Sequence, residues 1–236
     1  MNPNDPNVSL LEQAAAHLGE ALLEQLVFVG GAVAGLLITD PAMPEIRPTQ
    51  DVDVICRVIA RADYYQLGMQ LRERGFQEDT RPGAPLCRWC IEQIILDLMP
   101  SQGEMLGFSN RWYPLAVESA QLQVLPSGRS IRMVTAPVFL ATKLEAFYGR
   151  GQGAFVFSHD LEDLMAVVDG RESLLEECRL SPPELRNDLA AQFLELLKTS
   201  AFLEALPAFL PPDQASQQRL PDLLETLRAI TALAEP

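Results

Sequence analysis

Short apolar runs separated by glycine and proline turns fill the first half of the chain. A β-prone run at Leu26–Val29 ends at Gly30-Gly31, and a small, apolar stretch over residues 32–38 follows. This order predicts a strand, a glycine turn and a buried helix. Residues 51–55 alternate carboxylates with valines, which predicts a strand with one acidic and one apolar face.

Two further pairs of apolar runs have the pattern of hairpins. Residues 86–91 and 94–99 are separated by two polar residues, and residues 121–125 and 131–134 flank a Pro-Ser-Gly turn. Runs of this length around such turns are typical of antiparallel strands. The first half is therefore predicted to be mixed α/β with an antiparallel component.

The remaining pattern is helical. Ser9 and Glu12 have capping-box spacing and predict a first helix that runs to about Leu26, and residues 61–74 predict a second one that Gly75 ends. After residue 136 the expected elements are helices over residues 137–149 and 158–168, another opening at 181–184, a loop over 207–221 and a last helix over 222–233. We expect an α/β core at residues 1–135 and a helical region at 136–236.

Composition narrows the class of protein. With 48% hydrophobic and 21% charged residues, the chain is an ordinary globular protein and not a disordered, collagenous or coiled-coil one. The 32 acidic and 18 basic residues give a charge of -14, which opposes broad binding to polyphosphate. Signal-peptide and membrane-span patterns are missing, and the four cysteines are too few for a disulfide scaffold. We expect a cytoplasmic location, no membrane contact and free thiols.

Three aspartates are the strongest candidates for chemistry. Asp51 and Asp53, at positions i and i+2 of one strand, point to the same face and can share divalent cations. Asp97 is the one charge in an apolar run that should lie inside the sheet. A buried carboxylate needs compensation by a metal or an arginine, and three together would suit Mg²⁺. An Asp-x-Asp pair alone also occurs in solvated edge strands.

Candidates for phosphate binding carry weaker signals. Gly30-Gly31 can bring backbone N–H groups close to a phosphate, although a tight turn explains the same pair. Lys143 and Arg150 lie near one face of a predicted helix. The ordinary alternative is a solvated helix face for Lys143 and a simple salt bridge with an acid for Arg150. Asp160 and Asp163 fall in a first helical turn, where acids are favoured regardless of function.

Other catalytic chemistries find little support. Cys87 and Cys90 have the spacing of half a zinc site, yet a second Cys or His pair is missing and positions i and i+3 of a strand face opposite sides. His17 and His159 have no nearby nucleophile in sequence. We therefore expect any catalysis to depend on a metal.

Five segments in order resemble a known signature. They are Phe28-Val-Gly-Gly31, Arg47-Pro-Thr-Gln-Asp-Val-Asp53, the strand aspartate Asp97, Lys143-Leu-Glu-Ala-Phe-Tyr-Gly-Arg150 and Asp160-Leu-Glu-Asp163. The order resembles the polymerase-beta-like nucleotidyltransferase superfamily, and within it the AbiEii and MenT toxin type. The resemblance covers residues 28–170. The spacing between glycine pair and Asp-x-Asp is longer than in the family, and an insertion at Pro41–Ile46 is predicted to extend a loop.

The resemblance implies a nucleotidyltransferase fold, with a short mixed sheet flanked by helices and followed by a helical C-terminal region. The resemblance implies that three aspartates bind the metal, which would be Mg²⁺ or Mn²⁺. It also implies that these three aspartates, Lys143 and Asp163 are the catalytic residues. The metal ligands would be Asp51, Asp53 and Asp97. The residues that bind the nucleoside triphosphate would be Gly30, Gly31, Thr49, Lys143, Arg150 and Asp160. The family's essential late aspartate is carried to Asp163, with Asp160 as the close alternative.

The activity implied is transfer of a nucleoside monophosphate to an acceptor hydroxyl, either a tRNA 3′ end or a protein side chain, in a toxin–antitoxin or phage-defence setting with an antitoxin partner. Two alternatives stay open: a non-catalytic member that binds a nucleotide or partner, and a small-molecule nucleotidyltransferase acting on an antibiotic. An RNA acceptor needs basic residues near the site. The available arginines are Arg72, Arg74, Arg81, Arg88, Arg129, Arg132 and Arg150.

Overall fold

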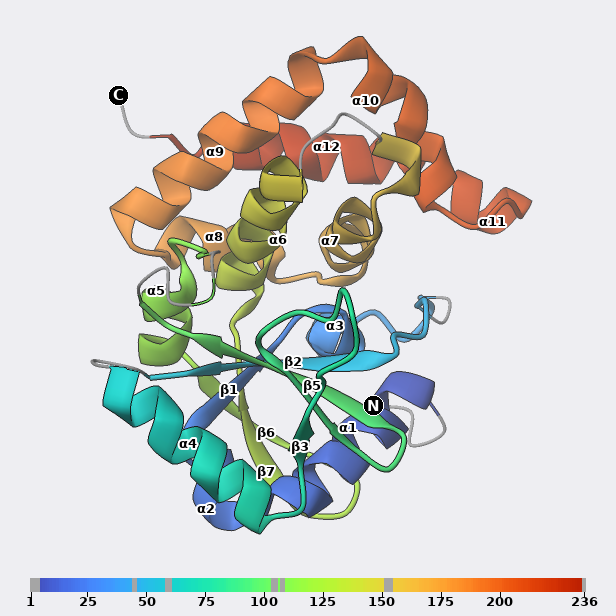
Figure 1. The fold of residues 1–236 in the computed structure, drawn as a ribbon. Coiled ribbons are helices and arrows are strands. Elements are labelled where there is room, and N and C mark those ends of the chain that lie inside the picture. The colour runs from blue at the N-terminus through green and yellow to red at the C-terminus, as the bar shows by residue number, and fades with distance from the viewer. Residues whose placement is uncertain are drawn as a thin grey trace. The chain divides into compact units, whose positions relative to one another are not determined.

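The computed structural model describes residues 5–43, 46–57, 61–102, 106, 109–150 and 155–234 (Figure 1). The chain forms two compact units. Met1–Gly35 and Arg47–Thr135 make the first, and Leu36–Ile46 and Ala136–Pro236 make the second. The segment Pro41–Ile46, the predicted insertion, thus groups with the second unit, and its Pro44 and Glu45 lie outside the described residues.

A mixed sheet organises the first unit. Its strands are β1 (Leu26–Val29), β2 (Asp51–Cys56), β3 (Gln77–Glu78), β4 (Arg88–Ile91), β5 (Ile94–Pro100), β6 (Gln121–Val124) and β7 (Ser130–Met133). Over the described ranges these seven strands lie in the order β3-β4-β5-β2-β1-β7-β6. The β2–β5 and β1–β7 pairs are parallel and the other neighbours are antiparallel. The predicted α/β class with a mixed sheet is confirmed.

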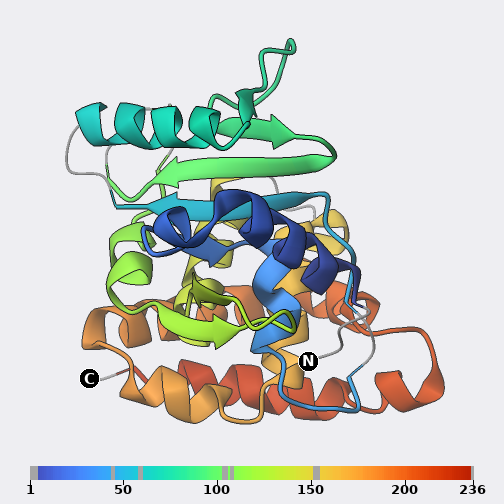
Figure 2. The same cartoon turned by 90° about the horizontal axis from the view of Figure 1, so that it is seen from below.

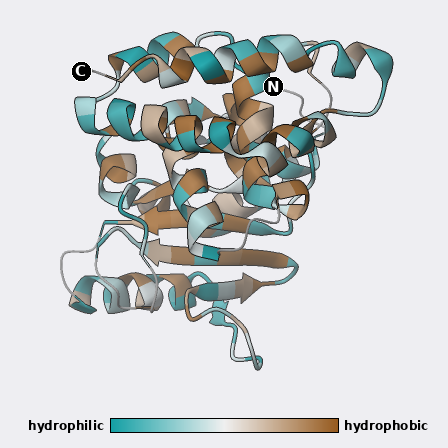
Figure 3. Cartoon of the chain, turned by 90° about the horizontal axis from the view of Figure 1, so that it is seen from above, coloured by the Kyte–Doolittle hydropathy of each residue, from teal (hydrophilic) through white to brown (hydrophobic). Residues whose placement is uncertain are grey.

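The predicted strands and hairpins are present, and the alternation of apolar residues explains them. Val52 and Val54 of β2 are fully buried, as are Leu96 and Leu98 of β5. Each such side chain contributes about 1.5–3 kcal/mol to folding. In Figure 3 the long strands are correspondingly brown along most of their length. Sequence reasoning missed β3, because its two exposed residues carry no apolar pattern.

The first unit also contains helices. They are α1 (Pro6–Leu18), α2 (Glu20–Leu23), α4 (Arg61–Glu73) and α5 (Tyr113–Glu118), and α3 (Gly31–Leu37) leads into the second unit. The prediction that Ser9 caps the first helix is wrong: Asp5 caps it by accepting from the N–H of Asn7, with Pro6 in the first turn. Gly75 ends α4 at a φ of 93°, as predicted.

Helix α4 packs on the β4 side of the sheet (Figure 2). A Cβ atom at Gly68 would lie 3.2 Å from the Trp89 ring, so the absence of a side chain there lets the indole approach the helix. The Arg72 guanidinium lies 5.2 Å from the centre of the same ring, in a cation–π contact.

Helices make up the second unit, as predicted. They are α6 (Ala136–Arg150), α7 (His159–Gly170), α8 (Leu174–Leu180), α9 (Pro183–Lys198), α10 (Ser200–Ala205), α11 (Gln214–Gln217) and α12 (Leu220–Thr231), with 3-10 turns at Phe155–Phe157 and Leu206–Phe209. Ser158 caps α7, as expected. Phe139 of α6, Leu164 of α7 and Phe193 of α9 are fully buried. No helix within the described ranges is both long and apolar enough to span a bilayer.

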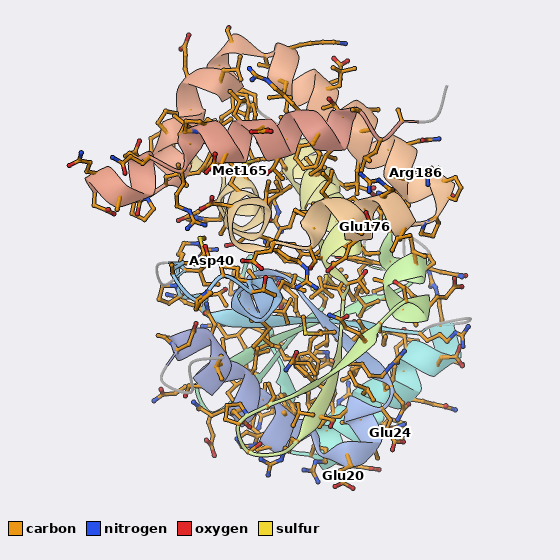
Figure 4. All side chains as sticks on the ribbon, turned by 180° about the vertical axis from the view of Figure 1, so that it is seen from behind. Glu20, Glu24, Asp40, Met165, Glu176 and Arg186 are labelled. Atoms are coloured by element: carbon orange, nitrogen blue, oxygen red, sulfur yellow. The ribbon has the colours of Figure 1, made fainter. Side chains whose placement is uncertain are left out.

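Hydrogen bonds hold Leu36–Ile46 to the second unit. The Gly170 carbonyl accepts from the N–H groups of Thr39 and Asp40, each at 2.9 Å. Arg219 joins Asp40 (Figure 4) at 2.8 Å and Asp169 at 2.9 Å. Burial raises the pKa of Asp169, and the hydrogen bond from Arg219 opposes that rise. A prediction based on sequence neighbours alone could not find these long-range bonds.

Candidate functional site

Strand pairing brings the three aspartates to neighbouring positions. The parallel register of β2 and β5 sets Asp53 opposite Asp97 and Asp51 opposite Ile95. Asp51 and Asp53, two positions apart on β2, share a face. The antiparallel register of β1 and β2 places Val29, the residue before Gly30, opposite Asp53. The carboxylates and the glycine turn therefore meet at one end of the central strands.

Arg88 compensates the buried carboxylate of Asp97, which is only 7% exposed. The guanidinium Nε donates to Asp97 Oδ1 at 2.8 Å and Nη2 donates to Asp97 Oδ2 at 2.7 Å. The same Nη2 donates to Asp51 Oδ2 at 3.1 Å. The bond with Asp97 raises the pKa of Arg88 above its ordinary value. The sequence left open whether a metal or an arginine compensates Asp97, and in the structure Arg88 does so.

A short hydrogen-bond chain holds Asp51 from its other side. Thr49 donates through Oγ1 to Asp51 Oδ1 at 2.9 Å. The N–H of Thr49 donates to Asn7 Oδ1 at 2.8 Å, and Asn7 Nδ2 donates to the Arg47 carbonyl at 3.1 Å. Asn7 is buried in α1, so the loop before β2 is anchored to that helix. Thr49 thus orients an aspartate, a role the sequence did not reveal.

Gly30 leaves room for the Asp53 side chain. Its φ is 73°, in the left-handed region that glycine adopts without strain. A Cβ atom at Gly30 would lie 1.9 Å from Asp53 Oδ2 and 2.8 Å from Asp53 Cβ. Both requirements exclude a larger residue. Gly30 is therefore needed to make room for the Asp53 side chain, whether or not its backbone also binds a phosphate.

The donor set fits a hard divalent cation. It offers only carboxylate oxygens, which suit Mg²⁺ or Mn²⁺, and an arginine nitrogen already lies between Asp51 and Asp97 as a cationic stand-in. Over the described ranges, however, no three His, Cys, Asp or Glu side chains converge as metal ligands. The carboxylates of Asp97 and Asp51 are oriented toward Arg88 instead.

The second unit contains a separate buried ion cluster between α6 and α7. Lys143, only 8% exposed, donates from Nζ to Asp163 Oδ2 at 2.7 Å and to Asp160 Oδ1 at 3.2 Å. Arg150 donates from Nη1 to Asp160 Oδ2 at 2.9 Å. The two cations and two anions balance. The solvated-face alternative for Lys143 is therefore wrong, and its expected contact with a triphosphate stays a prediction.

The residues expected to bind the nucleotide fall into both units. Gly30, Gly31 and Thr49 belong to the first unit, whereas Lys143, Arg150, Asp160 and Asp163 belong to the second. That they bind one triphosphate together remains a prediction from the motif order.

Most arginines considered for RNA binding already have partners. Arg72 pairs with Glu78 at 2.6 Å and Arg81 with Asp79 at 2.6 Å. Arg74 donates to the His17 carbonyl at 2.7 Å, and Arg132 donates to the Val117 carbonyl at 2.9 Å. The only arginines paired with Asp51, Asp97 or Asp160 in the described part of the chain are Arg88 and Arg150.

The face around Arg129 and Arg132 is mixed in charge. A cavity of about 730 Å³ there is also lined by Glu20 and Glu24. Glu20 in α2 and Glu24 directly after it are both exposed (Figure 4). This face is not the simple basic patch that an RNA backbone favours.

All four cysteines carry free thiols, as expected. Cys87 and Cys90 belong to the hairpin region and, with the rest of the described chain, form no metal-ligand group. Burial, and secondarily the Asp97 charge, raise the pKa of Cys87 to about 12. A thiol with such a pKa is a poor nucleophile at neutral pH.

No protein-family model matches the chain, and no curated protein matches it in sequence. The family membership implied by the five segments is thus a hypothesis that rests on those segments.

Proposed function

We propose that the protein is a divalent-cation-dependent nucleotidyltransferase that transfers a nucleoside monophosphate from a nucleoside triphosphate to an acceptor hydroxyl. The observation that carries the proposal is the β2–β5 register, which sets Asp53 opposite Asp97 with Asp51 on the same face. Carboxylates gathered on neighbouring strands are suited to hold the divalent cations that phosphoryl-transfer enzymes use.

Each residue has a defined part in this proposal. Asp51, Asp53 and Asp97 would hold Mg²⁺ or Mn²⁺, which when bound neutralises phosphate charge and lowers the pKa of a bound hydroxyl. By the resemblance, Asp97 would also assist deprotonation of the acceptor hydroxyl. Thr49 fixes the Asp51 carboxylate through its 2.9 Å hydrogen bond. Gly30 leaves the space that Asp53 occupies.

An RNA 3′ end is the acceptor that the motif order favours. The net charge of -14 and the intramolecular partners of the arginines oppose a large RNA footprint. A small-molecule acceptor is therefore the second candidate for the same chemistry. A protein acceptor and an antitoxin partner belong to the proposal only through the resemblance. A cytoplasmic location stays a prediction from the sequence pattern.

A non-catalytic binding protein is the alternative from a different class. The observation that favours it is the pairing of Asp97 with Arg88, since both carboxylate oxygens accept from the guanidinium. Such a protein would keep the sheet and bind a nucleotide or a partner without turnover.

The test is an acceptor screen with purified protein. Each of the four triphosphates, labelled at the α-phosphorus, is incubated with Mg²⁺ and protein alone, with total RNA, or with a panel of hydroxylated antibiotics. Label on RNA, protein or antibiotic identifies the acceptor and supports the proposal. Nucleotide binding by calorimetry without label on any acceptor supports the non-catalytic alternative.

A further inference from the structure

We propose that Arg88 and a divalent cation compete for the same carboxylates, so that the cation binds only when the guanidinium leaves Asp97. The proposal rests on the metal site of the proposed function but not on the transfer reaction. It identifies Arg88 as the residue that sets cation affinity, a role that sequence reasoning gave only to the aspartates.

The first argument is the position of one nitrogen. Arg88 Nη2 donates to Asp97 Oδ2 at 2.7 Å and to Asp51 Oδ2 at 3.1 Å, so it lies between the two carboxylates. A cation shared by Asp51 and Asp97 would need these same oxygens. The Arg88 guanidinium and a bound cation would therefore occupy the same position between the two carboxylates.

The second argument is electrostatic. Mg²⁺ lies about 2.0–2.1 Å from its oxygen ligands. A cation bound to Asp97 Oδ2 would lie at most about 5 Å from Nη2, which is 2.7 Å from that oxygen. Two like charges this close in a partly buried site repel strongly, since little water screens them. Simultaneous binding is thus unfavourable.

The third argument is that the guanidinium can leave. Its side chain is 21% exposed, and in the described part of the chain its hydrogen bonds go to Asp97 and Asp51. A rotation of the long side chain toward solvent would free both carboxylates. Competition, rather than permanent closure of the site, follows.

The test compares Mn²⁺ affinity, measured by electron paramagnetic resonance of the free ion, in wild type, Arg88→Met and Arg81→Met. Arg81 is the matched control because it makes the same two-pronged contact through Nε and Nη2 with Asp79, which is not a proposed cation ligand. We expect Arg88→Met to bind Mn²⁺ at least tenfold more tightly than wild type and Arg81→Met to change affinity by less than twofold. Equal affinity in wild type and Arg88→Met would overturn the proposal.

Arg88→Met leaves Asp97 buried without its arginine partner, which lowers stability. A second measurement therefore uses the wild type alone. In wild type, the Arg88 Nε–H signal in nuclear magnetic resonance reports the bond to Asp97. Saturation with Mg²⁺ should move this signal to the position of a solvent-exposed arginine. A signal that stays unchanged at saturation contradicts competition.

The outcomes separate this proposal from the proposed function. Tighter Mn²⁺ binding in Arg88→Met without transfer in any assay supports competition and refutes the transferase. Transfer by wild type with unchanged affinity in Arg88→Met supports the transferase and refutes competition. Failure of folded wild type and variant to bind Mn²⁺ refutes both.

Discussion

Replacement of Gly30 by alanine tests how the glycine turn and the Asp53 carboxylate depend on each other. The new Cβ would meet Asp53 Oδ2 at 1.9 Å, Cγ at 2.7 Å and Cβ at 2.8 Å. Rotation of the side chain can move the first two atoms but not Asp53 Cβ, which the β1–β2 pairing fixes. The substitution must therefore displace both the carboxylate and the backbone.

The magnitude can be divided into two parts with a matched control. Gly128 has a φ of 85° and nothing within 4 Å of an added Cβ, so Gly128→Ala measures the left-handed strain alone, about 1–2 kcal/mol. Overpacking adds about 1–3 kcal/mol in a site that cannot relax fully. Gly30→Ala should lower the free energy of unfolding by about 2–5 kcal/mol, clearly more than Gly128→Ala.

The assay is urea unfolding, which measures the free energy of unfolding. It compares Gly30→Ala, Gly128→Ala and the double variant Gly30→Ala with Asp53→Ala. Removal of the carboxylate should restore about 1–2 kcal/mol to Gly30→Ala, because Oδ2 and Cγ no longer clash. Equal destabilisation by Gly30→Ala and Gly128→Ala, with no coupling to Asp53, would show that the carboxylate does not lie over the glycine.

Further predictions concern the site, the ion cluster, the thiols and the acceptor. Asp51→Ala and Asp53→Ala should each abolish transfer while the free energy of unfolding changes by about 1 kcal/mol or less, and full activity in both would refute the metal site. Lys143→Ala should lower the free energy of unfolding by about 3–5 kcal/mol, since the buried carboxylates of Asp160 and Asp163 lose Lys143 and only Asp160 keeps its pair with the exposed Arg150, and the added change Asp163→Ala should recover part of it. The same Lys143→Ala protein should bind triphosphate more weakly by calorimetry, and unchanged affinity would limit Lys143 to its structural role. At pH 8 a disulfide reagent should label only Cys90 rapidly, because burial raises the pKa of the other three thiols to about 12; rapid labelling of all four would contradict their burial. Transfer to RNA should fall steeply from about 50 to 200 mM salt, whereas a shallow dependence indicates a small-molecule acceptor.

The strands and their faces were predictable because apolar alternation is local. The Arg88–Asp97 pair was also predictable from the sequence, although Arg88 was considered only as a candidate for RNA binding. A two-residue turn at Glu92-Gln93 forces Ile91 to pair with Ile94, and three steps outward along both strands Arg88 then lies opposite Asp97. The positive φ of Glu92, 51°, agrees with such a turn.

Other features could not be predicted, because they depend on contacts distant in sequence. The parallel β2–β5 register joins strands that are separated by a helix and a hairpin, so the pairing of Asp53 with Asp97 has no local signal. The assignment of Leu36–Ile46 to the helical unit depends on bonds to Gly170 and Arg219. The first helix is capped by Asp5 and not by the expected Ser9, because an N-cap aspartate followed by proline is a stronger helix start than the capping box at Ser9.

The most direct test of the central claim compares two positions of label on one triphosphate. Wild type and Asp53→Asn are incubated with Mg²⁺, the acceptor found in the screen, and triphosphate labelled at either the α- or the γ-phosphorus. The account predicts that wild type transfers the α-label and never the γ-label to the acceptor, and that Asp53→Asn transfers neither. Transfer of the γ-label, or undiminished transfer of the α-label by Asp53→Asn, would contradict it.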